Sequence, residues 1–133
     1  MEYQKVIVDD IDDLSNVMHK YQVGAFCLKN KLRTMYLLDG ALHRDDGPAY
    51  IENNYGIIKN TFDEKTVVYL RGNPAQCSPT HYYYRFGEQH CEFGPAHIEY
   101  NNKYMIVNAW YYLFGVEMSK EEWDQHMETK LYW

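Results

Sequence analysis

The feature that most constrains this chain is an internal repeat, because a repeated segment is expected to adopt the same local fold twice. Residues 34–52 and 81–99 align without a gap at an offset of 47, and eight of the 19 aligned positions are identical. Each copy places a His four residues before a Gly-Pro-Ala sequence. We therefore predict two tandem units, residues 34–79 and residues 80–118.

The pattern inside each copy favours β-strands. After Gly94 and Pro95, Ala96, Ile98 and Tyr100 alternate with His97 and Glu99. A period of two with one polar face is typical of a half-exposed antiparallel strand. Proline has a fixed φ and no amide hydrogen, so the proline of each copy is expected to open a strand rather than interrupt one. The prediction is an antiparallel sheet with a Gly-Pro-Ala turn before a strand in each unit.

The two ends of the chain predict helices instead. Residues 9–22 carry apolar side chains on one stripe and four aspartates in the first turn, where carboxylates meet the positive end of the helix dipole. Residues 120–130 follow Ser119, and Glu122 three residues after it completes a capping box. Two side chains on the second helix are expected to face inward: Trp123 and Met127.

Together these patterns predict a single domain of the β-rich α+β class. Two tandem antiparallel units of about 47 residues form its sheet, and an N-terminal and a C-terminal helix flank it. The predicted parts are residues 1–33, 34–79, 80–118 and 119–133.

Composition excludes several classes of function. The 133 residues carry a net charge of −6, which argues against binding to duplex DNA, since few bases are present to neutralise phosphates. No apolar run is long enough for a membrane helix, and the first residues lack the apolar stretch of a signal peptide. The cysteines, Cys27, Cys77 and Cys91, are odd in number and have no metal-type spacing. We expect a cytoplasmic protein with reduced thiols and no cofactor.

The repeated histidines allow two interpretations. His43 and His90 are candidates for acid–base chemistry on RNA or for metal binding. Their equivalent positions favour a structural role instead, because a catalytic pair needs two different roles whereas a structural unit repeats whole. Neighbouring acids such as Asp45 and Glu92 are expected to bond turn amides. We expect no metal, and the turn residues with a structural role are His43, Gly47, Pro48, His90, Gly94 and Pro95.

Aromatic residues are concentrated in the second unit and the strand after it. Residues 80–133 also carry eight acids and four bases. Exposed rings among acids suit an arginine-rich protein surface, through cation–π contacts and ion pairs. Base stacking on single-stranded RNA is the weaker alternative, because such sites normally surround their rings with Lys and Arg, whereas this region is net acidic. The residues expected to contact a partner are Tyr83, Tyr84, Phe86, Glu88, Tyr111, Tyr112 and Glu117.

The first copy resembles a known type of repeat. Residues 36–40, YLLDG, and residues 43–49, HRDDGPA, are similar to the "Y-L-x-G-x-x-H-R-x-D-G-P-A" repeats of bacteriophage and giant-virus proteins, which are distantly similar to MORN-type β-hairpin repeats. The second copy departs at Cys91, where the pattern has Arg, and at Phe93, where it has Asp. The resemblance implies a strand-rich fold and a viral source, with no established catalytic activity.

From these observations we expect a small non-enzymatic phage-type protein that binds a host protein in the host cytoplasm. Inhibition of that protein, for instance an anti-CRISPR-like competition with nucleic acid for a basic groove, is the favoured function. A small RNA-acting enzyme or RNA-binding module built around His43 and His90 is one alternative. A virion or assembly component whose repeat packs against copies of itself is the other.

Overall fold

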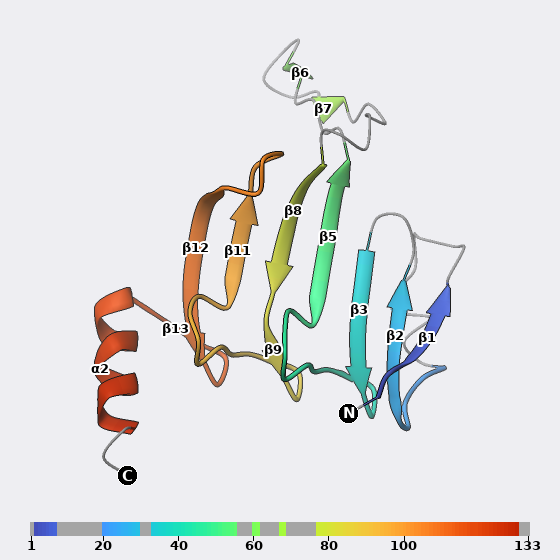
Figure 1. The fold of residues 1–133 in the computed structure, drawn as a ribbon, viewed down its shortest axis with the longest axis horizontal. Helices are drawn as coiled ribbons and strands as arrows, with labels where there is room; N and C mark the ends of the chain where they lie inside the picture. Colours follow the sequence, from blue (N-terminus) through green and yellow to red (C-terminus); the bar gives the residue numbers. More distant parts are fainter. Residues whose placement is uncertain are drawn as a thin grey trace.

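The computed structural model describes residues 2–7, 20–29, 33–55, 60–61, 67–68 and 77–130. Within these residues nine strands form one sheet, which Figure 1 shows as a single layer with one helix beside it. The strands of the sheet are β1 (Gln4–Ile7), β2 (Ala25–Lys29), β3 (Arg33–Leu38), β4 (Ala41–Leu42), β5 (Tyr50–Tyr55), β8 (Cys77–Tyr82), β11 (His97–Tyr100), β12 (Ile106–Leu113) and β13 (Val116–Met118).

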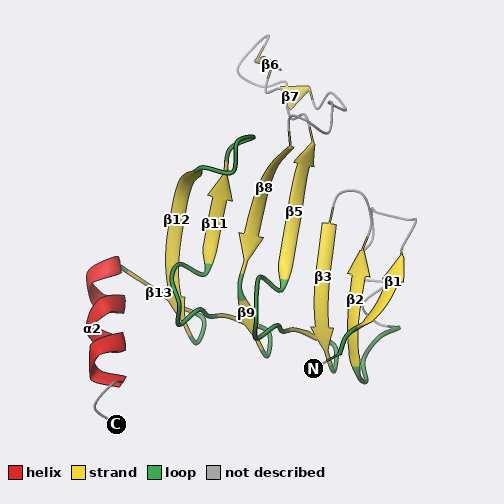
Figure 2. Ribbon diagram, viewed as in Figure 1, coloured by secondary structure: helices red, strands yellow, loops and turns green. Residues whose placement is uncertain are grey.

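The order across the sheet is β1-β2-β3-β5-β8-β11-β12-β13, and β4 pairs with β3. All pairs are antiparallel except β1 with β2, which is parallel. Two short hairpins complete the described strands: β9 (Tyr84–Arg85) with β10 (Glu88–Gln89), and β6 (Asn60–Thr61) with β7 (Val67–Val68). Figure 2 distinguishes these strands from the loops that join them.

The apolar core lies at the β2–β3 end of the sheet. Leu28, Met35 and Leu37 are buried together there, because alternate residues of the paired strands point to the same face. Phe26, Val6, Tyr21, Leu42 and Tyr50 pack around them. Cys27, on the opposite face of β2, is also buried.

A row of rings in contact crosses the middle of the sheet. Tyr50, Tyr82, His97 and Trp110 occupy one register line on four neighbouring strands. Their ring centroids are 5.3, 4.3 and 4.3 Å apart in that order. Cross-strand aromatic pairs of this kind stabilise a sheet by roughly 0.2–1 kcal/mol each. The row therefore supplies side-chain packing in a part of the sheet that has few aliphatic residues.

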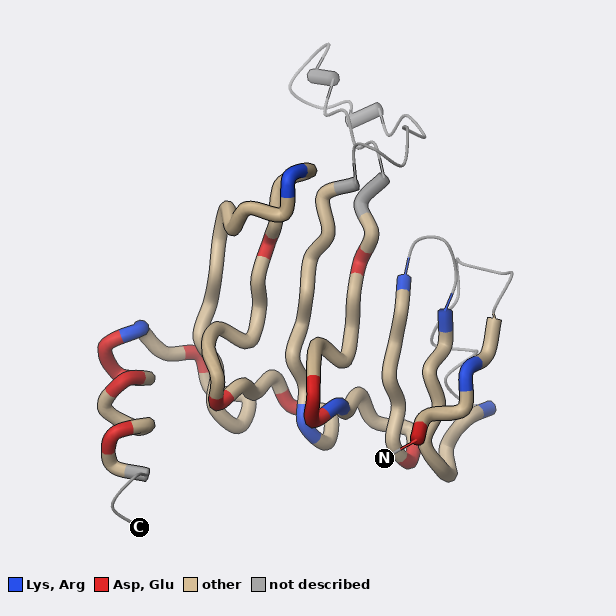
Figure 3. The backbone as a smooth tube through the Cα atoms, viewed as in Figure 1, with Lys and Arg blue, Asp and Glu red and all other residues tan. Residues whose placement is uncertain are grey.

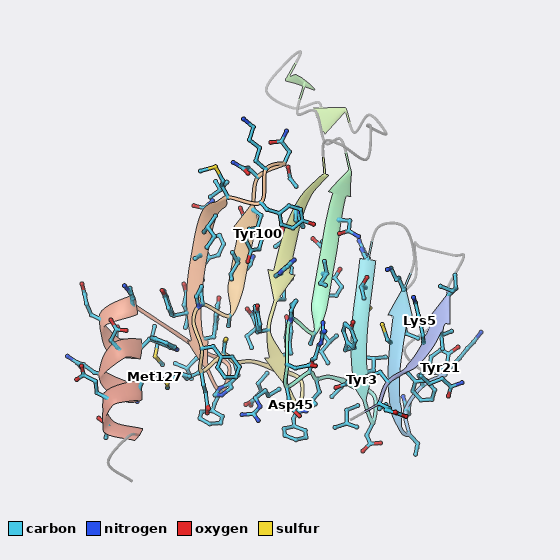
Figure 4. All side chains as sticks on the ribbon, viewed as in Figure 1. Tyr3, Lys5, Tyr21, Asp45, Tyr100 and Met127 are labelled. Carbon is cyan, nitrogen blue, oxygen red and sulfur yellow. The ribbon has the colours of Figure 1, made fainter. Side chains whose placement is uncertain are left out.

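The predicted C-terminal helix is confirmed as α2 (Lys120–Lys130). The amide of Glu122 donates to Ser119 Oγ over 3.2 Å, and the Glu122 carboxylate accepts from the Ser119 amide over 3.4 Å, which forms the capping box. Trp123 and Met127 are half-buried, and Figure 4 shows Met127 on the side of α2 that faces the sheet. The N-terminal helix predicted for residues 9–22 lies almost entirely outside the described residues.

The described residues agree with the β-rich α+β class, since one helix follows a large sheet. The alternation after Pro95 is confirmed, because Ala96 and Ile98 are buried while His97 and Glu99 are half-exposed. β5 and β11 each begin two residues after a proline, in agreement with the predicted strand openings. No helix among the described residues has the length and apolarity that crossing a membrane requires.

Candidate functional site at the hairpin edge of the sheet

Among the described residues, three two-residue turns lie side by side at one end of the strands of the sheet. We call this end of the sheet the hairpin edge, as distinct from the outer strands at its two sides. The turns are Asp39-Gly40, Phe86-Gly87 and Phe114-Gly115, and all six residues have φ between 48° and 84°. Paired positive φ values define a type I′ turn, which matches the twist of the flanking strands. Asp or Asn before Gly is the usual sequence for this turn, so Phe in the first position of two of them is exceptional.

His43 clamps the turn at Phe86. The amide of Phe86 donates to His43 Nδ1 over 3.0 Å, and the Phe86 ring lies 4.2 Å from the imidazole, centroid to centroid. Because Nδ1 accepts a hydrogen bond, the neutral ring carries its hydrogen on Nε2, which donates to Asp45 Oδ1 over 3.2 Å. The His43 side chain is 2% exposed, so both nitrogens are engaged in a buried position.

His90 makes the same contacts with the next hairpin. The amide of Phe114 donates to His90 Nδ1 over 3.0 Å, and the two rings are 4.4 Å apart. Nε2 of His90 lies 3.3 Å from Glu92 Oε1. The structural role predicted for both histidines agrees with these bonds. However, each imidazole bonds the backbone of the following hairpin rather than that of its own turn, because the strand pairing brings that hairpin alongside.

Each histidine turn also places a carboxylate next to its imidazole. Asp45 and Glu92 face the histidine rings, and they do so because each acid stands two residues after its His. The guanidinium of Arg85 lies between them, 3.4 Å from Asp45 Oδ1 and 3.9 Å from Glu92 Oε1. The two histidine turns, residues 43–49 and residues 90–96, are therefore joined through one arginine.

The first histidine turn contains a further arginine. Arg44 lies 4.0 Å above the Tyr36 ring, donates to Asp46 over 2.9 Å and reaches the Pro48 carbonyl at 3.2 Å. The Arg44 guanidinium holds the pKa of Asp46 below its usual range. The second turn has Cys91 in this place, and burial raises the pKa of its thiol. Cys91 is buried, which makes it a packing residue.

Near each end of the chain, an aromatic residue packs on a tyrosine of the hairpin edge. Tyr3 packs edge-on against Tyr36 at 5.1 Å and donates its hydroxyl to the His43 carbonyl. Trp123 lies 5.2 Å from Tyr111 and donates Nε1–H to the Cys91 carbonyl over 3.0 Å. Both terminal elements thus tie a histidine turn to the sheet.

Three phenylalanine rings at this edge are exposed. Phe86, Phe93 and Phe114 expose 71%, 81% and 68% of their surface. The turn segments that carry them, residues 39–49, 85–96 and 113–117, hold six carboxylates and two guanidinium groups. Figure 3 shows acidic and basic positions gathered along this edge, and Figure 4 places Asp45 there. A small hollow of about 70 Å³ lies between the two histidine turns, next to Arg85 and Phe93.

The residues predicted to contact a partner fall into two groups. Phe86 and the acids Glu88 and Glu117 are exposed at the hairpin edge. The tyrosines are half-buried, and Tyr83 and Tyr84 are alike in this respect although they are neighbours in the chain. Burial raises the pKa of both hydroxyls. The half-buried tyrosines of the predicted set are Tyr83, Tyr84, Tyr111 and Tyr112.

The two glycines of the histidine turns differ in their surroundings. Gly47 and Gly94 both lie in bends, and neither has a positive φ. A Cβ on Gly47 would come within 2.9 Å of the Arg44 guanidinium carbon, so close approach of Arg44 explains the first glycine. A Cβ on Gly94 would meet nothing within 4 Å.

Sequence reasoning missed Phe93 and Phe114 as exposed rings and Arg85 as the bridge between the turns. A signal for Phe114 is present in the chain. Residues 83–87, YYRFG, and residues 111–115, YYLFG, match at an offset of 28.

Among the described residues, no group of three or more His, Cys, Asp or Glu side chains is placed to hold a metal ion. No protein-family model, curated protein or solved structure matches the chain. The chemistry available to the hairpin edge therefore follows from its own geometry: a fixed backbone frame, exposed rings and a surplus of carboxylates.

Proposed function

We propose that the protein is a non-catalytic binding module that attaches its hairpin edge to a basic, arginine-bearing surface of another protein and inhibits that protein. The observation that carries this proposal is the exposure of Phe86, Phe93 and Phe114 at one edge of the sheet. Large rigid rings supply contact area at low entropic cost, and residues of this kind dominate binding energy at protein interfaces.

The backbone conformation of two of these phenylalanines supports a role beyond folding. Phe86 and Phe114 have φ of 48° and 51°, a region that costs a non-glycine residue roughly 1–2 kcal/mol. Asp39 occupies the same position in the first turn, where its carboxylate accepts from the Gly24 amide over 2.8 Å. A turn that served stability alone would favour Asp or Asn at all three positions.

The charge of the hairpin edge specifies the chemistry of the partner. Both of its arginines already pair with carboxylates of the same edge, Arg44 with Asp46 and Arg85 with Asp45. The surplus carboxylates favour a basic partner, whose association they accelerate by electrostatic steering. Arginine is the best fit, because a guanidinium both stacks on Phe and forms paired hydrogen bonds with carboxylates.

We also infer that the sheet consists of two tandem units of about 47 residues followed by a third hairpin. Equivalent bonds support this: the His43 amide donates to Tyr36, and the His90 amide to Tyr83, both over 3.0 Å. The resemblance of the first unit to phage and giant-virus repeats favours a host protein as the target, a bacterial defence factor being one such case. An acidic edge can occupy the groove in which such a factor holds nucleic acid.

The acid–base alternative has less support from the geometry. A general base needs a ring nitrogen within reach of its substrate. His43 and His90 use Nδ1 for a turn amide and Nε2 for a carboxylate, and both side chains are at most 2% exposed. The bonds favour a clamp over a catalytic pair.

The proposal is tested with a triple variant, Phe86→Asn, Phe114→Asn and Phe93→Ser, which removes the three exposed rings and leaves favourable turn residues. Val23→Ser, which is 82% exposed on the loop before β2, is the matched control. We expect wild type and control to capture the same protein from a bacterial lysate, identified by mass spectrometry, and the triple variant to lose it. Capture by the folded triple variant at wild-type level would contradict the proposal.

A second measurement tests the charge of the partner. Binding of the captured protein, measured in purified form, is expected to slow as salt rises, because steering is screened beyond a Debye length of about 8 Å at physiological salt. A partner whose contact surface is acidic, or an association rate that does not change with salt, would contradict the arginine-bearing surface.

A further inference from the structure

Strand β12 belongs to the third hairpin and corresponds to β3 and β8 in the first two. Among the described residues, β12 is paired along less of its length than β3 and β8 are. β3 lies between β2 and β5, and β8 lies between β5 and β11, so both are paired on each side. β12 pairs with β11 on one side, but on the other only Tyr111, Tyr112 and Leu113 pair, with β13. Within the described part of the chain, no strand pairs with this second edge of β12 over residues 106–110.

This free edge carries no charge of its own and is mostly apolar, with Asn108 as its polar residue. Ile106 and Val107 each expose 59% of their surface, and Tyr104 and Met105 beside them are also exposed. Residues 104–116 contain neither a charged residue nor a proline. Sheet proteins usually protect a free edge with charged residues, proline or a bulge, because unpaired strand edges associate with other strands. Of these features, β12 has only the register shift beside Glu99.

The opposite edge of the sheet is protected by contrast. β1 carries the exposed Lys5 in its four residues, and Glu2 precedes it. Figure 1 shows β1 and β12 at opposite sides of the layer, with α2 beyond β12 and β13. If copies associated head to tail, β12 of one copy would lie against β1 of the next, which carries Lys5. If β12 paired with β12 of a second copy, neither paired strand would carry a charge.

From these observations we propose that β12 of one copy pairs antiparallel with β12 of a second copy, over residues 106–110, to form a closed twofold dimer. We assign an antiparallel direction to this pairing because β11 pairs antiparallel with both of its neighbours, β8 and β12. An isologous contact uses the same patch on both copies, and an uncharged strand can lie opposite itself without repulsion.

The local geometry limits this contact to a short segment. A register shift beside Glu99 bends β12 near Val107, and β13 occupies the edge from Tyr111 onward. A twofold axis at Asn108 pairs this residue with Asn108 of the second copy, and it pairs Val107 with Ala109 of the second copy. Because the far edge of each copy is β1, the assembly ends at two copies.

Sedimentation velocity across a concentration series up to about 200 µM tests the proposal, since association depends on protomer concentration. We expect wild type to shift from monomer to dimer, and Val107→Lys to weaken the dimer at least about tenfold by placing charge on the edge. Val23→Lys, a more exposed position at the other end of the sheet, is expected to dimerise as wild type does.

A cross-link gives an independent result that does not depend on loss of binding. Asn108→Cys is expected to form a disulfide between copies under oxidising conditions, and Val23→Cys is not. A wild type that stays monomeric throughout, a Val107→Lys variant that dimerises normally, or growth into species larger than a dimer would each overturn the proposal. Failure here leaves the hairpin-edge proposal intact, because the two surfaces share no exposed residue.

Discussion

The two histidine turns share a backbone frame but differ in what surrounds it. In both, Nδ1 accepts the amide of a turn Phe and Nε2 faces a carboxylate two residues on. In the first turn Arg44 packs on Tyr36, whereas the second turn has the buried Cys91 in that place. The comparison teaches that the histidine and its acid define the frame, and that the residue beside the histidine is free to change.

The third hairpin extends the comparison. Met118 follows Gly115 by three residues, as His90 follows Gly87, and the next residues form α2 instead of another turn. The thioether sulfur of methionine is only a weak acceptor, so it is a poor substitute for Nδ1 in holding a further turn amide. The first two hairpins, each of which is followed by another hairpin, therefore carry a histidine, whereas the third hairpin, which is followed by α2, does not.

The largest expected effect is the loss of a clamp. His43→Ala leaves the Phe86 amide without its acceptor and removes a buried ring, so we expect unfolding to be easier by about 2–4 kcal/mol. His90→Ala is expected to cost about 1–3 kcal/mol, because it frees only the last hairpin and α2. Urea denaturation measures both differences.

Met118→Ala is the matched control for these variants. It removes a half-buried side chain at the equivalent position without breaking a clamp, so the expected loss is about 0.5–1 kcal/mol. Equal losses from all three substitutions would mean that packing alone explains the histidines.

A smaller difference is expected between the two glycines of the turns. Gly47→Ala forces the Arg44 guanidinium off the Tyr36 ring and should destabilise the protein by about 1 kcal/mol. Gly94→Ala meets open space, and reduced freedom of the unfolded chain should stabilise the protein by about 0.5 kcal/mol. Thermal melts of the two variants show the effect directly, and shifts of the same sign in both would contradict the assigned role of Arg44.

The smallest expected effect concerns the ring row, where His97 stands in the position that Tyr50 holds in the first copy. Burial lowers the pKa of His97, although Glu99 and Glu52 act in the opposite direction. Because the folded pKa lies below the unfolded value, the unfolded chain binds more protons as the pH falls through about 6.5. Stability is therefore expected to decrease from pH 7.5 to pH 5.

His97→Phe keeps the stacked ring and removes the titrating group, so its loss of stability over this pH range should be smaller than that of wild type. Burial also lowers the pKa of His81, which accounts for dependence that remains in the variant. Tyr50→Phe serves as the control and should retain the full wild-type dependence. An unchanged pH profile in His97→Phe would remove His97 from this account.

The sequence predicted the features that depend on neighbouring residues. Both the capping box at Ser119 and Glu122 and the alternation after Pro95 follow from local patterns. The bonds from His43 to Phe86 depend on strand pairing across 43 residues, and no local pattern specifies them. The same holds for Arg85, whose partners come from two different turns.

The most direct test of the clamp is amide hydrogen exchange at Phe86 and Phe114 in wild type, His43→Ala and His90→Ala. The account predicts that both amides are protected in wild type. It predicts further that the Phe114 amide alone loses protection in His90→Ala, while the Phe86 amide becomes the faster of the two in His43→Ala. Fast exchange of both amides in wild type, or protection that neither substitution changes, would contradict the claim that each histidine holds the turn of the next hairpin.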